Sequence, residues 1–185
     1  MKKIASLIIA AAAAFCAISC STDKKFTLVV PDCEITTPPD SLNLDSFYQK
    51  YINVNGIHLI SSEKVADSVL KQAFRTIYTM TMALPEEVTA AMAKVNTKVA
   101  IMARYEATED IPEHSHMANR DTSDIVLNWN LRARGLGGSV RFPMTSGAEE
   151  NVMGYQIDKY HAEDILLHEF SHSINLVGIC QVDPS

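Results

Sequence analysis

Hydrophobic residues recur at intervals of three and four positions over residues 64–83, which is the period of an amphipathic helix. The apolar positions are Val65, Val69, Ala73, Ile77, Met80 and, just beyond, Leu84. A second helix is predicted from Pro85, because proline suits the first helical position and two glutamates follow near the positive end of the helix dipole. Helical periodicity resumes at about His161 and is predicted to end near Val177.

Short apolar runs between these helices predict strands. The runs are Phe26–Val30, Val54–Ile60, Lys98–Ala103, Ile125–Leu127 and Ser139–Met144. Pro143 confines the last of these to the edge of a sheet, because proline cannot donate a backbone hydrogen bond. Leu42–Tyr51 is predicted as a short helix. This order of elements predicts an α+β fold, a small mixed sheet with helices on one face.

The third helix carries the sequence Ile165-Leu-Leu-His-Glu-Phe-Ser-His172, an HExxH pattern. Two histidines four residues apart lie on one helical face, so His168 and His172 can bind one metal ion. Glu169 is offset around the helix, where its carboxylate can reach a water on the metal. This is the arrangement of a zinc hydrolase with Glu169 as base. The pattern arises by chance roughly 0.01 times in a chain of this composition. The alternative is a helix whose histidines bind no metal.

A catalytic zinc site needs three protein ligands and a water, and the third ligand is not evident. Asn175 and Gly178 stand where the long metzincin pattern has glycine and histidine, and no glutamate follows His172. The candidates are Asp183, the loop Glu113-His114-Ser115-His116, His161, and the pair Glu149-Glu150. Each is also explained as a solvated surface group. A truncated or fragmentary form of a longer protein is therefore also expected.

The N-terminus is predicted to be a signal peptide. A basic start, Met1-Lys2-Lys3, precedes an apolar stretch from Ile4 to Phe15 that is too short to span a membrane. The next residues, Ala17-Ile18-Ser19-Cys20, resemble the bacterial lipobox. That resemblance implies removal of residues 1–19, acylation of Cys20 and a lipid anchor in the bacterial cell envelope. An ordinary secretory signal is the alternative.

Removal of residues 1–19 leaves 166 residues, enough for one domain, and changes the formal charge from -6 to -8. No basic cluster remains, which argues against a nucleic-acid partner. Residues 20–53 are expected to form a tether and N-terminal segment, and residues 54–185 the main domain. Cys33 and Cys180 either form a disulfide or are free thiols.

Several segments together resemble a family of secreted, zincin-like bacterial proteins of the HExxH zinc metallopeptidase superfamily. They are Asp110–His114, Arg132–Gly138, Glu149–Asn151 and His168–His172. The resemblance implies a metallopeptidase-like fold and a Zn²⁺ cofactor. It also implies an edge strand along the substrate cleft, for which Val140–Thr145 is the candidate. The Gly135–Gly138 loop either shapes the cleft or forms a tight turn into that strand.

Two functions follow from these features. The first is a zinc metallopeptidase, in which Glu169 takes a proton from water and passes it to the leaving amine, and Tyr160 or His161 stabilises the oxyanion. The second is a non-catalytic envelope lipoprotein that binds a peptide or protein partner through a degenerate or incomplete zinc site. No organic cofactor is expected, and the sequence does not indicate an oligomeric state.

Overall fold

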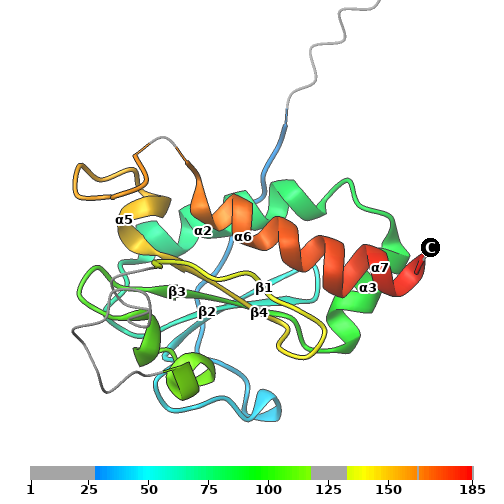
Figure 1. The fold of residues 1–185 in the computed structure, drawn as a ribbon, viewed down its shortest axis with the longest axis horizontal. Helices are drawn as coiled ribbons and strands as arrows, with labels where there is room; N and C mark the ends of the chain where they lie inside the picture. The colour runs from blue at the N-terminus through cyan, green and yellow to red at the C-terminus, as the bar shows by residue number, and fades with distance from the viewer. Residues whose placement is uncertain (1–27, 118–132, 162, 185) are drawn as a thin grey trace, which may run out of the picture.

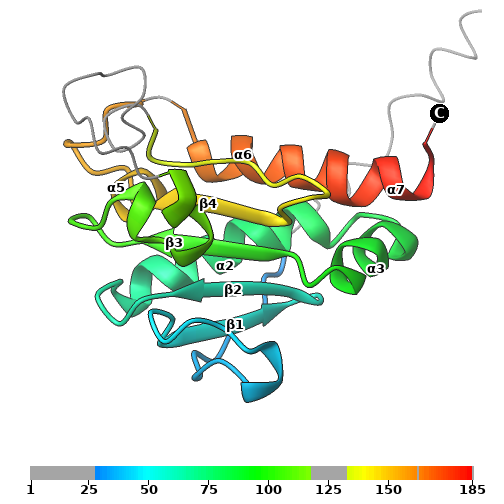
Figure 2. The same cartoon turned by 60° about the horizontal axis from the view of Figure 1, so that its bottom comes forward.

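A four-stranded sheet lies at the centre of the described structure, with an apolar cluster on each face. The computed structural model describes residues 28–117, 133–161 and 163–184, and within them four strands lie in the order β1-β2-β3-β4 (Figure 2). These are β1 (Lys50–Val54), β2 (Ile57–Ser61), β3 (Lys98–Met102) and β4 (Met144–Ala148). β1 is antiparallel to β2, whereas β2, β3 and β4 are parallel. The predicted α+β fold with a small mixed sheet is confirmed.

A tight hairpin joins β1 and β2. Asn55 and Gly56 have φ angles of 52° and 86°, as a two-residue type I′ turn requires. The Gly56 amide also donates to the Asn53 side chain at 3.0 Å. The strand predicted over Val54–Ile60 is therefore confirmed only from Ile57 onward. The helix predicted at Leu42–Tyr51 is wrong, because its last residues belong to β1. β1 crosses the boundary that was expected between the N-terminal segment, residues 20–53, and the main domain, residues 54–185.

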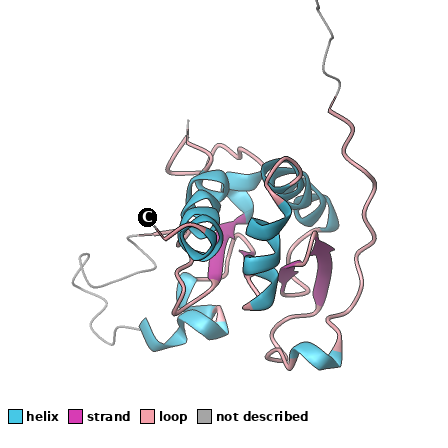
Figure 3. Ribbon diagram, turned by 90° about the vertical axis from the view of Figure 1, so that its right-hand side faces the viewer, coloured by secondary structure: helices cyan, strands magenta, loops and turns pink. Residues whose placement is uncertain are grey.

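The longer helices cover one face of the sheet (Figures 1 and 3). They are α2 (Asp67–Thr81), α3 (Glu86–Lys94) and α6 (Ile165–Ser173), and α6 continues without a break through the π-helical η4 (Ile174–Ile179) into α7 (Cys180–Val182). The apolar sides of the helices pack against alternate residues of the strands. The helices contribute Leu70, Ile77, Leu166 and Phe170, and the strands contribute Ile52, Leu59, Val99 and Ile101. The helices predicted over 64–83 and after Pro85, and the strand predicted at Lys98–Ala103, are confirmed.

Short helical turns and loops cover the opposite face. They are η1 (Asp40–Leu42), η2 (Thr108–Asp110) and η3 (Pro112–Met117). A second apolar cluster fills this layer, with Tyr48, Tyr51, Ile60, Ala100, Met102, Ile111, Met144 and Ala148 as its buried members. The short helix α5 (Glu149–Val152) follows β4 directly.

The last strand lies further along the chain than predicted. Residues 139–142 form a turn in which Ser139 and Phe142 exchange backbone hydrogen bonds. Pairing with β3 begins at the Pro143 carbonyl, which accepts from the Lys98 amide at 2.8 Å, and continues from Met144. β4 is buried, and an antiparallel bridge joins its outer side at Ser146 to Leu136. The candidate edge strand Val140–Thr145 is therefore confirmed only in part: β4 is the last strand of the sheet, but it begins at Met144, and Leu136 bridges its outer side at Ser146.

The remaining N-terminal predictions fall partly outside the described residues. The strand predicted at Phe26–Val30 is absent over residues 28–30, which have no regular structure. The strand predicted at Ile125–Leu127, the signal region and Cys20 lie outside the described residues. Among the described residues, no helix is both long and apolar enough to cross a membrane. Cys33 and Cys180 are free thiols, half-buried and exposed respectively.

Candidate metal site

The histidine pair lies on the solvent-facing side of α6. This helix begins at Ile165, later than the predicted start near His161, because Asp164 caps it: its carboxylate accepts a hydrogen bond from the Leu167 amide at 2.9 Å. Leu166 and Phe170 turn into the core. The 3.6-residue period therefore exposes His168 and His172 together on the outer face.

The two imidazoles lie close together through their Nε2 atoms. Their Nε2 atoms are 3.3 Å apart and their ring planes meet at 72°. Tetrahedral zinc with Zn–N bonds of about 2.0–2.1 Å holds two nitrogen ligands about 3.3–3.4 Å apart. The Nε2–Nε2 distance of the pair therefore matches the spacing of two ligands of one tetrahedral zinc. Without a metal, the same distance lets one neutral ring donate a hydrogen bond to the other.

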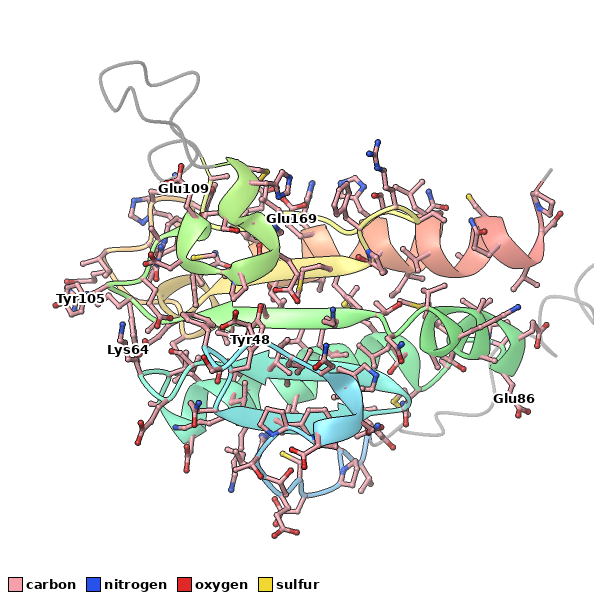
Figure 4. The ribbon with its side chains drawn as sticks, turned by 90° about the horizontal axis from the view of Figure 1, so that it is seen from below. Tyr48, Lys64, Glu86, Tyr105, Glu109 and Glu169 are labelled. Atoms are coloured by element: carbon pink, nitrogen blue, oxygen red, sulfur yellow. The ribbon has the colours of Figure 1, made fainter. Side chains whose placement is uncertain are left out.

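Glu169 lies beside this pair at the β4 edge of the sheet (Figure 4). Its side chain is half-buried under the Gly135–Gly138 segment, which we call the glycine segment. A Cβ atom on Gly137 would lie 2.9 Å from Glu169 Oε2 and 3.0 Å from His172 Cβ. The backbone of the glycine segment therefore rests directly on the carboxylate and on the second histidine.

The other predicted ligands are placed elsewhere. His114 is buried, and its Nε2 lies 3.1 Å from Ser146 Oγ, while the exposed His116 stacks on Phe142. Burial lowers the pKa of His114. His161 lies in an exposed turn with φ 50°, before the helix rather than on it. Asp183 is exposed beyond the end of α7.

The third ligand remains unassigned. Within the part of the chain that the structure describes, no group of three or more His, Cys, Asp or Glu side chains could hold a metal ion. Glu149 and Glu150 serve other partners: Glu149 Oε2 accepts from the Arg104 amide at 3.1 Å, and Glu150 pairs with Arg134. The structure thus brings together His168, His172 and Glu169 from the sequence-predicted set.

The sequence alone indicates no role for three supporting residues, Asn151, Ser173 and Arg134, although the first and last lie in segments quoted for the family resemblance. Asn151 accepts from the Ile165 amide at 2.8 Å and donates to Asp158 at 2.8 Å, which fixes the start of α6. Ser173, next to His172, lies 2.5 Å from Thr145 Oγ1 and links the helix to β4. Arg134 anchors the glycine segment. Only the N-cap Asp164, before an apolar run, carries a recognisable sequence signal for the helix start.

Comparison with protein-family models, with curated proteins and with solved structures finds no match to this chain. The geometry of the site therefore carries the functional argument.

Proposed function

We propose that this chain is a zinc-dependent, metallopeptidase-like lipoprotein that hydrolyses peptide bonds. The observation that supports this most directly is the 3.3 Å separation of His168 Nε2 and His172 Nε2, which matches two ligands of one tetrahedral zinc. A zinc ion, when bound, polarises a carbonyl and lowers the pKa of water. His168 and His172 would hold it.

Glu169 is the general base in this proposal. It follows His168 directly, so about 100° of helical rotation separates the two side chains and keeps the carboxylate beside the metal position. The carboxylate accepts a proton from the attacking water and returns it to the leaving amine. The Glu169 carboxylate suits this role because it lies beside His172, under the backbone of Gly137.

The glycine segment provides a place for an extended peptide. Leu136 exchanges backbone hydrogen bonds with Ser146, with Leu136 N to Ser146 O at 3.2 Å and Ser146 N to Leu136 O at 2.8 Å. In an antiparallel pair, adjacent residues direct their N–H and C=O groups the other way. Gly137, which is exposed, therefore presents its backbone groups away from β4, where a substrate backbone could pair.

The location proposed is the bacterial cell envelope. The sequence Ala17–Cys20 supports acylation of Cys20 after loss of residues 1–19, which would anchor the chain to a membrane from the periplasmic side or the cell surface. Intact mass of the chain recovered from membranes tests this part, and an unacylated Cys20 contradicts it.

A second function is supported by one observation. The described residues supply two histidine ligands and no third, which is the feature of an incomplete site. In that case the surface beside the glycine segment binds a peptide or protein partner without cleaving it.

Zinc content and turnover separate the two functions. The mature chain, residues 20–185 with Cys20→Ser, should retain one zinc after dialysis and lose it in the His168→Ala/His172→Ala double variant. It should cleave a broad peptide library, and Glu169→Gln should reduce cleavage at least about a hundredfold while keeping zinc.

The matched control is Glu86→Gln. Glu86 lies at the start of α3, at the far end of the molecule from Glu169 (Figure 4), and its loss should leave cleavage unchanged. Zinc retention with cleavage that Glu169→Gln does not affect contradicts the enzymatic proposal. Absence of both zinc and cleavage favours the binding function.

A further inference from the structure

Arg134 is held by a buried bidentate ion pair. Its Nε lies 2.6 Å from Glu150 Oε1 and its Nη2 lies 3.0 Å from Glu150 Oε2. The two side chains are only 13% and 8% exposed. The planar guanidinium matches the carboxylate at both oxygens, which fixes the direction of the arginine as well as its position.

The other guanidinium donors bind the loop after β3. Nη2 reaches the carbonyls of Ala103 and Arg104 at 3.3 and 3.4 Å, and Nη1 donates to the carbonyl of Glu106. The backbone amide of Arg134 donates to the Tyr160 hydroxyl at 3.1 Å. One residue therefore ties together the loop after β3, helix α5 and the loop that leads into α6.

The glycine segment begins at the residue after Arg134. Its far end is also fixed, because the Gly138 amide donates to Ser173 Oγ at 3.0 Å. Between these anchors the glycines leave no room for a side chain of their own: a Cβ on Gly135 would lie 2.5 Å from Ile165 Cγ2 and 3.5 Å from Glu169 Cγ. A shift of the segment therefore changes the space around the Glu169 carboxylate.

We infer that Arg134, paired with Glu150, is a positioning residue that holds Glu169 in place through the glycine segment. The inference rests on the proposed function, because it assigns Arg134 to the same reaction. Arg134 does not contact the histidine pair, so its loss should affect the base and not zinc binding. Lysine keeps the charge but cannot form the fork of hydrogen bonds.

The test compares Arg134→Lys with two further variants in the zinc-loaded mature chain. Arg134→Lys should retain zinc and lower kcat about tenfold to a hundredfold with KM changed less than about twofold, because the base is misplaced. Gly137→Ala leaves the ion pair intact and should also lower kcat, since its Cβ displaces Glu169 Oε2. Arg75→Lys, an exposed arginine on α2, is the matched control and should change neither value.

A second readout does not depend on turnover. In wild type, the α-protons of Gly135 and the γ-protons of Glu169 should give a nuclear Overhauser contact, because the Cβ position of Gly135 lies 3.5 Å from Glu169 Cγ. Arg134→Lys should lose this contact and keep the contacts within α6. If wild type shows no cleavage, the proposed function fails, and the Overhauser contact alone decides whether Arg134 positions Glu169. Retention of that contact and of wild-type kcat in folded Arg134→Lys overturns the inference.

Discussion

His168 uses its two ring nitrogens differently. Nε2 faces His172, whereas Nδ1 lies 3.4 Å from Glu163 Oε1, just beyond ordinary hydrogen-bond distance. Both side chains are at least half exposed, at 50% and 57%, so this contact adds little to folding stability. Its value lies in orientation, because a carboxylate at Nδ1 favours the tautomer whose Nε2 is free to bind metal.

Glu163→Gln should therefore weaken zinc binding about tenfold without changing the thermal midpoint of unfolding. Competition with a chromogenic chelator measures the affinity, and Glu86→Gln serves again as the control for loss of one negative charge. Equal zinc affinity in wild type and Glu163→Gln shows that the carboxylate does not orient His168.

Among the elements, the continuous helix from Ile165 to Val182 depends on one close contact. Gly178 in η4 packs against α3 so tightly that a Cβ would lie 2.7 Å from Val88 Cγ1 and 3.2 Å from Met92 Sδ. The wider π-helical turn directly follows the histidine pair, and such turns are frequent at functional sites. The position of the pair along the sheet is thus linked to the fit between η4 and α3.

Gly178→Ala brings two opposing effects into competition. Alanine favours a helix over glycine by about 1 kcal/mol, but overpacking a tight contact costs about 1–3 kcal/mol. Gly178→Ala should therefore lower the free energy of unfolding by up to about 2 kcal/mol, and Val88→Ala should restore part of that loss in the double variant. Urea denaturation measures both. If Gly178→Ala is more stable than wild type, the prediction is wrong, and α3 moves to accommodate the added methyl group without a loss of stability.

Periodicity and motif spacing predict the elements that depend on local sequence. α2, α3 and β3 are of this kind, and so is the convergence of His168 and His172, which needs only one helical turn. The predictions fail where contacts between segments distant in sequence determine the structure. The bridge from Leu136 to Ser146 and the Arg134–Glu150 pair have no local signal. Neither the residue types nor their sequence neighbours indicate which distant residue each one contacts in the folded chain. The Asn55-Gly56 turn did carry a local signal, and it should have split the strand predicted there.

At the scale of the whole molecule, the sheet separates an apolar helical layer from a lower layer that contains buried titratable groups. His114 lies in the lower layer against Ser146, and burial is the main cause that lowers its pKa from the usual 6.5. Glu113 opposes this shift, and His116 adds to it. Burial lowers the pKa of His58 in the same layer as well.

These pKa shifts determine whether the free energy of unfolding rises or falls with pH. Because the folded-state pKa of His114 lies below the unfolded value, its stabilising contribution is fully present above pH 6.5 and is lost as pH falls toward the folded pKa. The loss approaches about 1.4 kcal/mol per pH unit for one group while pH lies between the two pKa values. Wild type should lose more unfolding free energy than His114→Gln between pH 7.5 and 5.5. His161→Asn, at an exposed turn, is the control, and parallel curves for wild type and His114→Gln contradict the prediction.

The two-point attachment of the glycine segment has a consequence for the order in which a working site assembles. The histidine pair requires one turn of helix, which forms locally and early, whereas the segment over Glu169 arrives only when Arg134, β4 and α6 meet across the chain. If zinc is held as proposed, a partly folded chain can already bind metal while its base is not yet in position. If the chain also cleaves peptide bonds as proposed, it would then carry zinc before the glycine segment fixes Glu169, and this long-range closure would delay cleavage of its own exposed backbone.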